Sequence, residues 1–168
     1  MNLPTILLMK IREQAKTTED LISRIPPARL NWRPTVPARA GSVFRVDELL
    51  GHLLECAAGF CAVLQKVHPD ELAHFEKLRP RRRNHRCGRG EAVAELKVYF
   101  DHVEEGFETL TNDDLERIVP TVFVPEGQAV LTILLSNLEH LIHHKYQLFF
   151  YLKMMDVPVG TKELYGLD

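Results

Sequence analysis

Four segments of this chain carry apolar residues at helical spacing, and proline or glycine separates each segment from the next. The segments span about residues 3–25, 42–67, 91–110 and 128–155. Apolar residues that recur every three or four positions form one face of an α-helix, and that face must be buried against other helices. Only the short stretch 121–124 has the alternation of a strand. The pattern predicts an all-α fold, a four-helix bundle, in one domain over residues 1–168.

Charge and cysteine content exclude several classes of protein. A net charge of −2 gives the whole chain no electrostatic preference for nucleic acid or for a membrane surface. No apolar run approaches the roughly 20 residues that span a bilayer, and the first residues lack the pattern of a secretory signal. The cysteines form no CxxC pair, which argues against a disulfide framework. We expect a cytoplasmic protein with reduced thiols and no membrane partner.

Two loops interrupt the helical pattern. The first loop ends where the second helix is predicted to begin, near Ser42, a residue type that caps helix N-termini. An arginine-rich loop lies between Pro80 and Gly90. It could contact phosphates, but it lacks interleaved aromatic residues, so a solvated loop is the stronger interpretation and nucleic acid is not expected as a partner.

Three histidines stand out as candidate metal ligands. His140 and His144 are four residues apart, so their rings lie one helical turn apart on the same core-facing stripe. His52 lies at the core-facing edge of the second helix and is the natural third ligand. Three protein ligands with one open position are the usual plan of a catalytic metal site. His68, His74, His85 and His102 occur in polar surroundings and are expected at the surface.

The fourth metal position decides between two kinds of site. Water there would leave an open, catalytic centre, whereas Cys56, one turn after His52, would close the site. The residue after His140 is Leu141, not the glutamate of zinc proteases, so peptide hydrolysis by that mechanism is not expected. A general base would come from Glu48, Glu55 or metal-bound hydroxide.

The two histidine blocks carry a family resemblance. Residues 46–53 read VDELLGHL, and residues 139–148 read EHLIHHKYQL, followed by Tyr151-Leu152-Lys153. The arrangement His…HxxxHxxQ resembles the DinB/YfiT-like superfamily, and the similarity extends over nearly the whole chain. This chain departs from the commonest family block in having Lys145-Tyr146 where Arg-Gly precedes the glutamine.

The resemblance implies an up-down four-helix bundle with a longer crossover connection, frequently dimeric. It also implies zinc or nickel bound by His52, His140 and His144, with a solvent or substrate position on the metal. Some members are similar in activity to transferases or isomerases that use a low-molecular-weight thiol. Asn137 and Gln147 are then expected to support the ligands or to contact a small-molecule substrate.

Two functional hypotheses follow. The first is a metal-dependent enzyme, either a hydrolase or a low-molecular-weight-thiol S-transferase, in which the metal activates water or a thiol. The second is a structural or sensory metal protein with a closed site that includes Cys56. A homodimer is also expected, because the fourth helix carries more apolar residues than one bundle can cover. These residues are Leu135, Ile142, Tyr146, Phe149 and Phe150.

Overall fold

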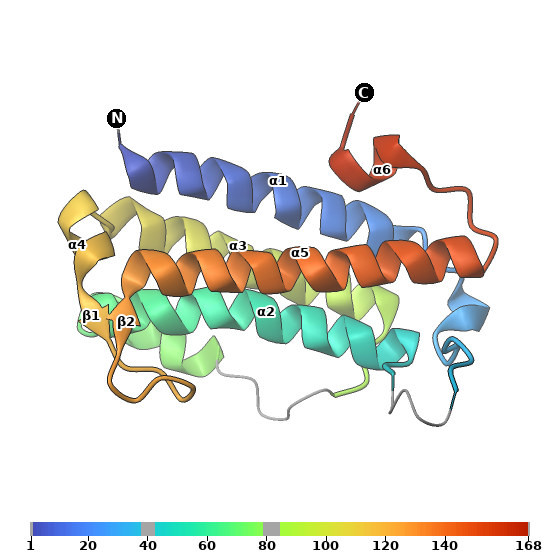
Figure 1. Ribbon diagram of the computed structural model, residues 1–168, viewed down its shortest axis with the longest axis horizontal. Helices are drawn as coiled ribbons and strands as arrows, with labels where there is room; N and C mark the ends of the chain where they lie inside the picture. Colours follow the sequence, from blue (N-terminus) through green and yellow to red (C-terminus); the bar gives the residue numbers. More distant parts are fainter. Residues whose placement is uncertain (1, 38–42, 79–84, 168) are drawn as a thin grey trace.

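The computed structural model describes residues 2–37, 43–78 and 85–167. Within them the long helices are α1 (Leu3–Ser23), α2 (Val46–Val67), α3 (Arg89–Thr109) and α5 (Val130–Met154) (Figure 1). Short helical turns are η1 (Pro27–Arg29), η3 (Ala73–Leu78), α4 (Asn112–Glu116) and α6 (Thr161–Tyr165). The strands β1 (Ile118–Val119) and β2 (Gln128–Ala129) form one antiparallel pair. The all-α prediction is confirmed.

The long helices pack in a ring in which α2 contacts α3 and α5, and α1 contacts the same two helices. Direction reverses from α1 to α2 and from α3 to α5, whereas α2 and α3 run the same way (Figure 1). One backbone hydrogen bond agrees with this arrangement: the Cys87 N–H, just before α3, donates to Asp47 O at the start of α2 (3.1 Å). The longer crossover expected from the sequence therefore joins α2 to α3.

Helix boundaries differ from the predicted ones mainly at α2. This helix begins at Val46, and the Arg45 N–H donates to the Glu48 carboxylate at 2.9 Å. Ser42, the predicted N-cap, lies outside the described residues, as do residues 79–84 of the arginine-rich loop. The stretch 121–124, which has the alternation of a strand, is not one, since the strands lie on either side of it. Its residues Val122 and Phe123 form an exposed hairpin tip (80% and 90% exposed).

Lys145 ties the C-terminal segment to the bundle. Its side chain is buried, and its Nζ donates to Gln14 Oε1 (2.7 Å), Thr17 Oγ1 (3.2 Å) and Leu164 O (3.0 Å). These acceptors belong to α1 and α6, so one ammonium group links three helices. No helix in the described ranges is both long and apolar enough to cross a lipid bilayer.

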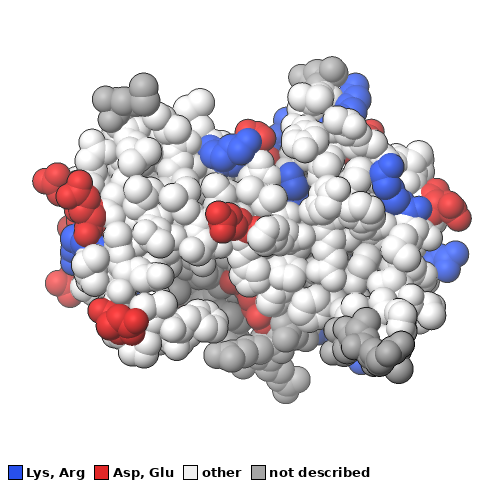
Figure 2. Space-filling view, in the orientation of Figure 1, with Lys and Arg blue, Asp and Glu red and all other residues white. Residues whose placement is uncertain are grey.

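The outward side of α5 remains partly apolar. Leu135, Tyr146 and Phe150 are exposed, whereas Ile142 is half-buried and Phe149 is buried. The rings of Tyr146 and Phe150 pack against Phe149, with centroid distances of 6.0 and 6.2 Å. Phe149 is therefore a core residue rather than an exposed one, which corrects the expectation. The face of the molecule on which α5 lies shows only scattered charged side chains (Figure 2).

Candidate metal centre

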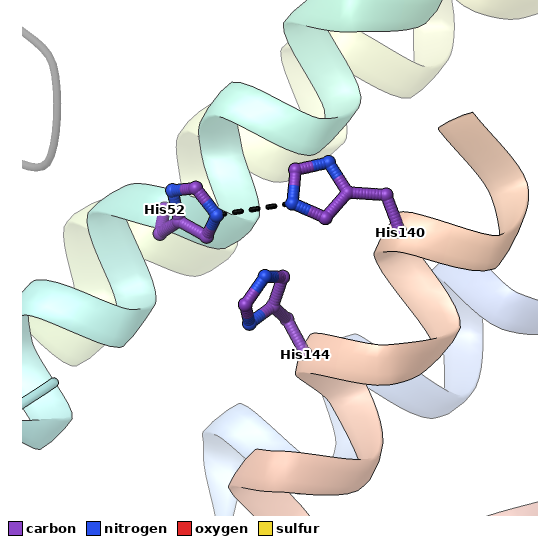
Figure 3. Close-up of side chains that lie close together, drawn as sticks. All are labelled: His52, His140 and His144. Carbon is purple, nitrogen blue, oxygen red and sulfur yellow. Dashed lines mark hydrogen bonds between the residues drawn. The ribbon is translucent and has the colours of Figure 1, made fainter. Parts of the chain in front are cut away.

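Three histidine rings meet between α2 and α5 (Figure 3), although His140, expected on the core-facing stripe, is exposed. His52 Nε2 lies 3.1 Å from His140 Nε2. The ring of His144 is 4.3 Å from that of His52 and 4.8 Å from that of His140, centroid to centroid. One nitrogen from each ring lies within 4.8 Å of the other two. The structure thus gathers three candidate ligands from distant parts of the sequence, since His52 and His140 are 88 residues apart.

Close backbone packing positions His52. Gly51 faces the segment that leads into α3, and a Cβ atom at this position would lie 1.9 Å from the His85 carbonyl oxygen. Only glycine lets the two backbones approach this closely. Phe44, just before α2, stacks on the His52 ring (centroids 4.9 Å apart) and meets His144 edge-on (5.9 Å). These contacts limit how far the two rings can rotate.

A chain of hydrogen bonds orients His144. Its Nδ1 lies 2.9 Å from Gln147 Oε1, and Gln147 Nε2 donates to Tyr151 Oη (2.9 Å). The Tyr151 hydroxyl in turn donates to the Phe44 carbonyl at 3.0 Å. Because an amide oxygen only accepts, His144 Nδ1 carries the proton and Nε2 presents its lone pair to the cluster. Gln147, predicted to support a ligand, lies where it can do so.

The His52 ring, on α2, also has a hydrogen-bond partner. His52 Nδ1 lies 3.3 Å from the Glu55 carboxylate. A carboxylate that accepts from one ring nitrogen makes the other nitrogen a better metal ligand. Glu48, the alternative base considered from the sequence, instead accepts from the Arg45 backbone and lies near Arg33 and Arg86. Of the two glutamates, only Glu55 adjoins the histidines.

The electrostatics of the cluster favour neutral rings. Burial, followed by the neighbouring His52, lowers the pKa of His140. Burial also lowers the pKa of His144 to about 4, although its hydrogen bond to Gln147 acts in the opposite direction. Both rings are therefore unprotonated at neutral pH, which is the form that binds metal.

Cys56 has the properties of a core residue. Its side chain is 3% exposed, and burial raises the pKa of its thiol to about 12. A thiol must lose its proton to bind a metal tightly. Among the described residues, the group of mutually close ligand atoms around His52 contains no cysteine. These observations support the interpretation of Cys56 as core filler.

A groove opens beside the cluster. It has a volume of about 480 Å³, and its lining includes His52, His140, Asn137 and the hairpin-tip residues Val122 and Phe123. The Asn137 Nδ2 atom is buried and has no hydrogen-bond partner within the described structure. A buried amide donor left in this state costs free energy unless a ligand or water satisfies it. Asn137 is thus placed to contact a molecule in the groove.

Sequence reasoning missed or misplaced several residues around the site. Phe44 escaped notice because it precedes α2 and belongs to no helical stripe. His68, expected at the surface, is half-buried and lies 3.1 Å from Glu71 and 3.4 Å from Asp114. His74 and His102 do lie near the surface, but they approach each other and Glu105. No local spacing signals that proximity, because His74 and His102 belong to different elements.

The fold and the cluster together define a class, namely helical bundles that gather three imidazoles between two of their helices. A family model of the DinB superfamily matches residues 10–148, and the chain belongs to that superfamily. Its structure is similar to the crystal structure of a DinB-like protein, YjoA, from Bacillus subtilis. The TM-score is 0.66, with 19% identity, over 91% of this chain and 96% of that one. No curated protein matches the chain.

Proposed function

We propose that the protein is a metal-dependent enzyme in which His52, His140 and His144 hold one zinc or nickel ion. The observation that carries the proposal is the convergence of three imidazoles at the edge of a groove. Two nitrogens bound tetrahedrally at 2.0–2.1 Å from one zinc lie about 3.3 Å apart, close to the 3.1 Å between His52 and His140. A bound divalent ion would supply Lewis acidity, lowering the pKa of a water or low-molecular-weight thiol at its open position.

The chain's own residues would orient the ligands. Gln147, Tyr151 and the Phe44 carbonyl hold His144 in one tautomer, and Glu55 does the same for His52. Ligands held in this way need little rearrangement to bind, so less affinity is lost to ordering. The same contacts leave the groove side of the cluster available to a substrate.

The groove suggests a small, partly apolar substrate with an oxygen acceptor. Asn137 Nδ2 would donate a hydrogen bond to that oxygen, while Val122 and Phe123 would cover the apolar part and exclude water. An electrophilic carbonyl or a related centre fits this description, and the reaction is then hydrolysis or transfer to a thiol. The sequence and the geometry of the site fit hydrolysis and thiol transfer equally well.

Turnover assays on metal-loaded protein test the proposal. Bacillithiol, mycothiol, glutathione and model esters are the substrates, and Asn137→Ala is compared with Asn31→Ala, a change at an exposed residue outside the groove. We expect activity with at least one thiol or ester, a raised KM for Asn137→Ala and wild-type behaviour for Asn31→Ala. Absence of turnover with all of these substrates would remove the enzymatic proposal.

X-ray absorption on the zinc form separates the open site from a closed one. We expect only nitrogen and oxygen scatterers near about 2.0–2.1 Å. A sulfur scatterer near about 2.3 Å would place Cys56 on the metal and favour the structural or sensory alternative.

The cysteines Cys56, Cys61 and Cys87 are free and buried, which suits a reducing compartment, and we propose the cytoplasm.

We also propose a homodimer formed through the outward side of α5. Leu135, Tyr146 and Phe150 are each more than 40% exposed on one helix. Apolar side chains gathered on a single helix commonly mark an interface, and a two-fold contact would cover both copies at once.

A further inference from the structure

A second group of ligand atoms lies on the surface between η3 and α3. It consists of His74, His102 and Glu105, each of which offers one atom within 4.8 Å of the other two. None of these residues belongs to the triad of His52, His140 and His144. We propose that this group is a second metal site, selective for zinc, that fastens η3 to α3.

The ring of His102 is already oriented for ligation. Its Nδ1 donates to the Val98 carbonyl at 2.7 Å, one turn earlier in α3. The proton therefore lies on Nδ1, and Nε2 is the atom that can bind a cation. Backbone carbonyls commonly fix metal-binding histidines in this way.

His74 and Glu105 supply the remaining donors. His74 Nε2 lies 3.1 Å from one carboxylate oxygen of Glu105 and 3.2 Å from the other. Glu105 follows His102 by three residues in α3, so the two side chains share one face of that helix. Two imidazoles and one carboxylate, with water completing the tetrahedron, form a donor set that zinc prefers over magnesium or calcium.

The ion pair alone does not account for the arrangement. His74 and Glu105 side chains are 42% and 48% exposed, and an ion pair at this exposure contributes at most about 1 kcal/mol. Burial of Phe75 anchors η3 to the bundle, and this contact adds only a weak link between η3 and α3. A shared cation, by contrast, binds both elements at once.

The proposed site is coupled to the groove through Phe75. This buried side chain meets the His74 ring edge-on at 4.9 Å and the His102 ring at 5.3 Å, centroid to centroid. Phe75 also lines the groove that contains His52 and His140. Zinc bound by His74 and His102 would therefore fix one wall of the groove without touching the triad.

Zinc binding by tag-free protein tests the proposal. The background is the triple variant His52→Ala/His140→Ala/His144→Ala, and the measurement is calorimetric titration with zinc. We expect one zinc per chain in this background. Affinity should fall by more than about tenfold in His102→Gln and in Glu105→Gln. Glu108→Gln, an exposed change on the same helix, should leave it unchanged.

The stoichiometry of the wild-type protein separates the two metal proposals. Two zinc ions per chain are expected. If the wild-type protein binds one zinc ion, and that ion is lost in His102→Gln but retained in the triple variant, the result would support the second site and contradict the triad. A triad variant that binds no zinc, or binds it equally well with Glu105→Gln, would overturn the second site.

Hydrogen exchange tests the fastening of η3. In the triple variant that lacks His52, His140 and His144, zinc should slow amide exchange in residues 73–78. Adding Glu105→Gln to this variant should abolish the slowing. Exchange rates in this segment that are identical with and without bound zinc would refute the proposed link to α3.

Discussion

His144 and Lys145 are neighbours on α5, yet they serve opposite sides of the helix. Lys145 faces α1 and α6, and its three ammonium protons each meet an acceptor of the chain. His144 faces α2, where its Nε2 joins ring nitrogens of His52 and His140. The Lys145 ammonium group has a hydrogen-bond acceptor for each of its protons, whereas the His144 ring adds its lone pair to those of the other two histidines.

This difference distinguishes a structural polar cluster from a site for a ligand. A buried charge with a full set of partners stabilises one arrangement of the chain, and removing it leaves acceptors unsatisfied. His144 and His52 donate their Nδ1 protons to Gln147 and Glu55, so their Nε2 atoms turn lone pairs toward each other, which is unfavourable. A cation resolves that conflict, so the triad side is expected to respond to metal and the Lys145 side to be indifferent to it.

Removal of a triad ring should give the largest effect. We expect His144→Ala and His52→Ala to weaken metal binding by more than about a hundredfold, beyond the 10–100-fold typical of residues that only support ligands. Metal analysis after equilibrium dialysis provides the measurement, and circular dichroism should show that the helices remain. His143→Ala, an exposed ring beside the triad, is the control. A ligand variant that binds as many metal ions per chain as the wild-type protein would contradict the triad.

Lys145→Met should show the opposite pattern. The change leaves Gln14, Thr17 and the Leu164 carbonyl without their common donor. We expect the free energy of unfolding to fall by about 2–3 kcal/mol, with metal content unaffected. Urea denaturation measures the first quantity, and Lys97→Met at an exposed position is the control. If Lys145→Met lost metal while keeping its stability, the division between the two sides of α5 would be wrong.

Asp114 extends the comparison to a third polar cluster. Burial opposes ionisation of this carboxyl, but hydrogen bonds from Thr111 and Arg117 and the charge of His68 outweigh it and lower the pKa of Asp114 to about 2. The pKa of the folded state is thus below the 3.8 of an unperturbed aspartate. Its contribution, roughly 2 kcal/mol, is present above pH 4 and lost as the pH falls toward 2.

The pH dependence of thermal unfolding tests this contribution. Asp114→Asn should reduce the loss of stability between pH 4 and pH 2, whereas Asp113→Asn, at an exposed neighbouring position, should lose stability as the wild-type protein does. Equal acid sensitivity in the two variants would show that Asp114 is not a stabilising acid group.

Gln147 tests how much orientation contributes on the triad side. In Gln147→Leu the proton on His144 Nδ1 loses its acceptor, and we expect metal affinity to fall about tenfold. Gln147→Glu keeps an oxygen in place and should restore affinity. Competition with a chromophoric chelator gives the dissociation constants. Equal affinities in the leucine and glutamate variants would mean that this hydrogen bond does not matter to binding.

The smallest effect on the free energy of folding is expected at the outward side of α5. Phe150→Glu should convert a dimer to a monomer while changing the stability of each subunit by no more than about 0.5 kcal/mol. Met9→Glu, at an exposed position on α1, should leave the dimer intact. Phe149→Glu is unsuitable, because Phe149 is buried within one subunit. Sedimentation that finds the unmodified protein monomeric at micromolar concentration would contradict the dimer.

Local spacing predicted the features that depend on a single helix. The stripes of α1, α2, α3 and α5, the pairing of His140 with His144 and the edge position of His52 all follow from 3.6 residues per turn. Gln147 was placed correctly for the same reason, since it follows His144 by three residues.

Features that depend on how helices are joined were beyond this reasoning. Phe44 reaches the triad because the loop before α2 is fixed by backbone bonds from Val46 to Trp32 and from Asp47 to Leu30. His74 meets His102 because α2 and α3 run in the same direction, so that η3 returns to the end of α3. Burial of Phe149 depends on two neighbouring rings, Tyr146 and Phe150, which cover it.

In the enzyme proposed above, the hairpin between β1 and β2 is the part of the groove that can vary without moving the three histidines. Its ladder is only two residues long on each strand, and its exposed tip, Val122 and Phe123, forms part of the groove. The three histidines, by contrast, are anchored in α2 and α5. Exposed loop tips accept substitutions and insertions that helices do not. Selection or engineering acting on this tip can therefore alter the lining of the groove while the three histidines stay in place.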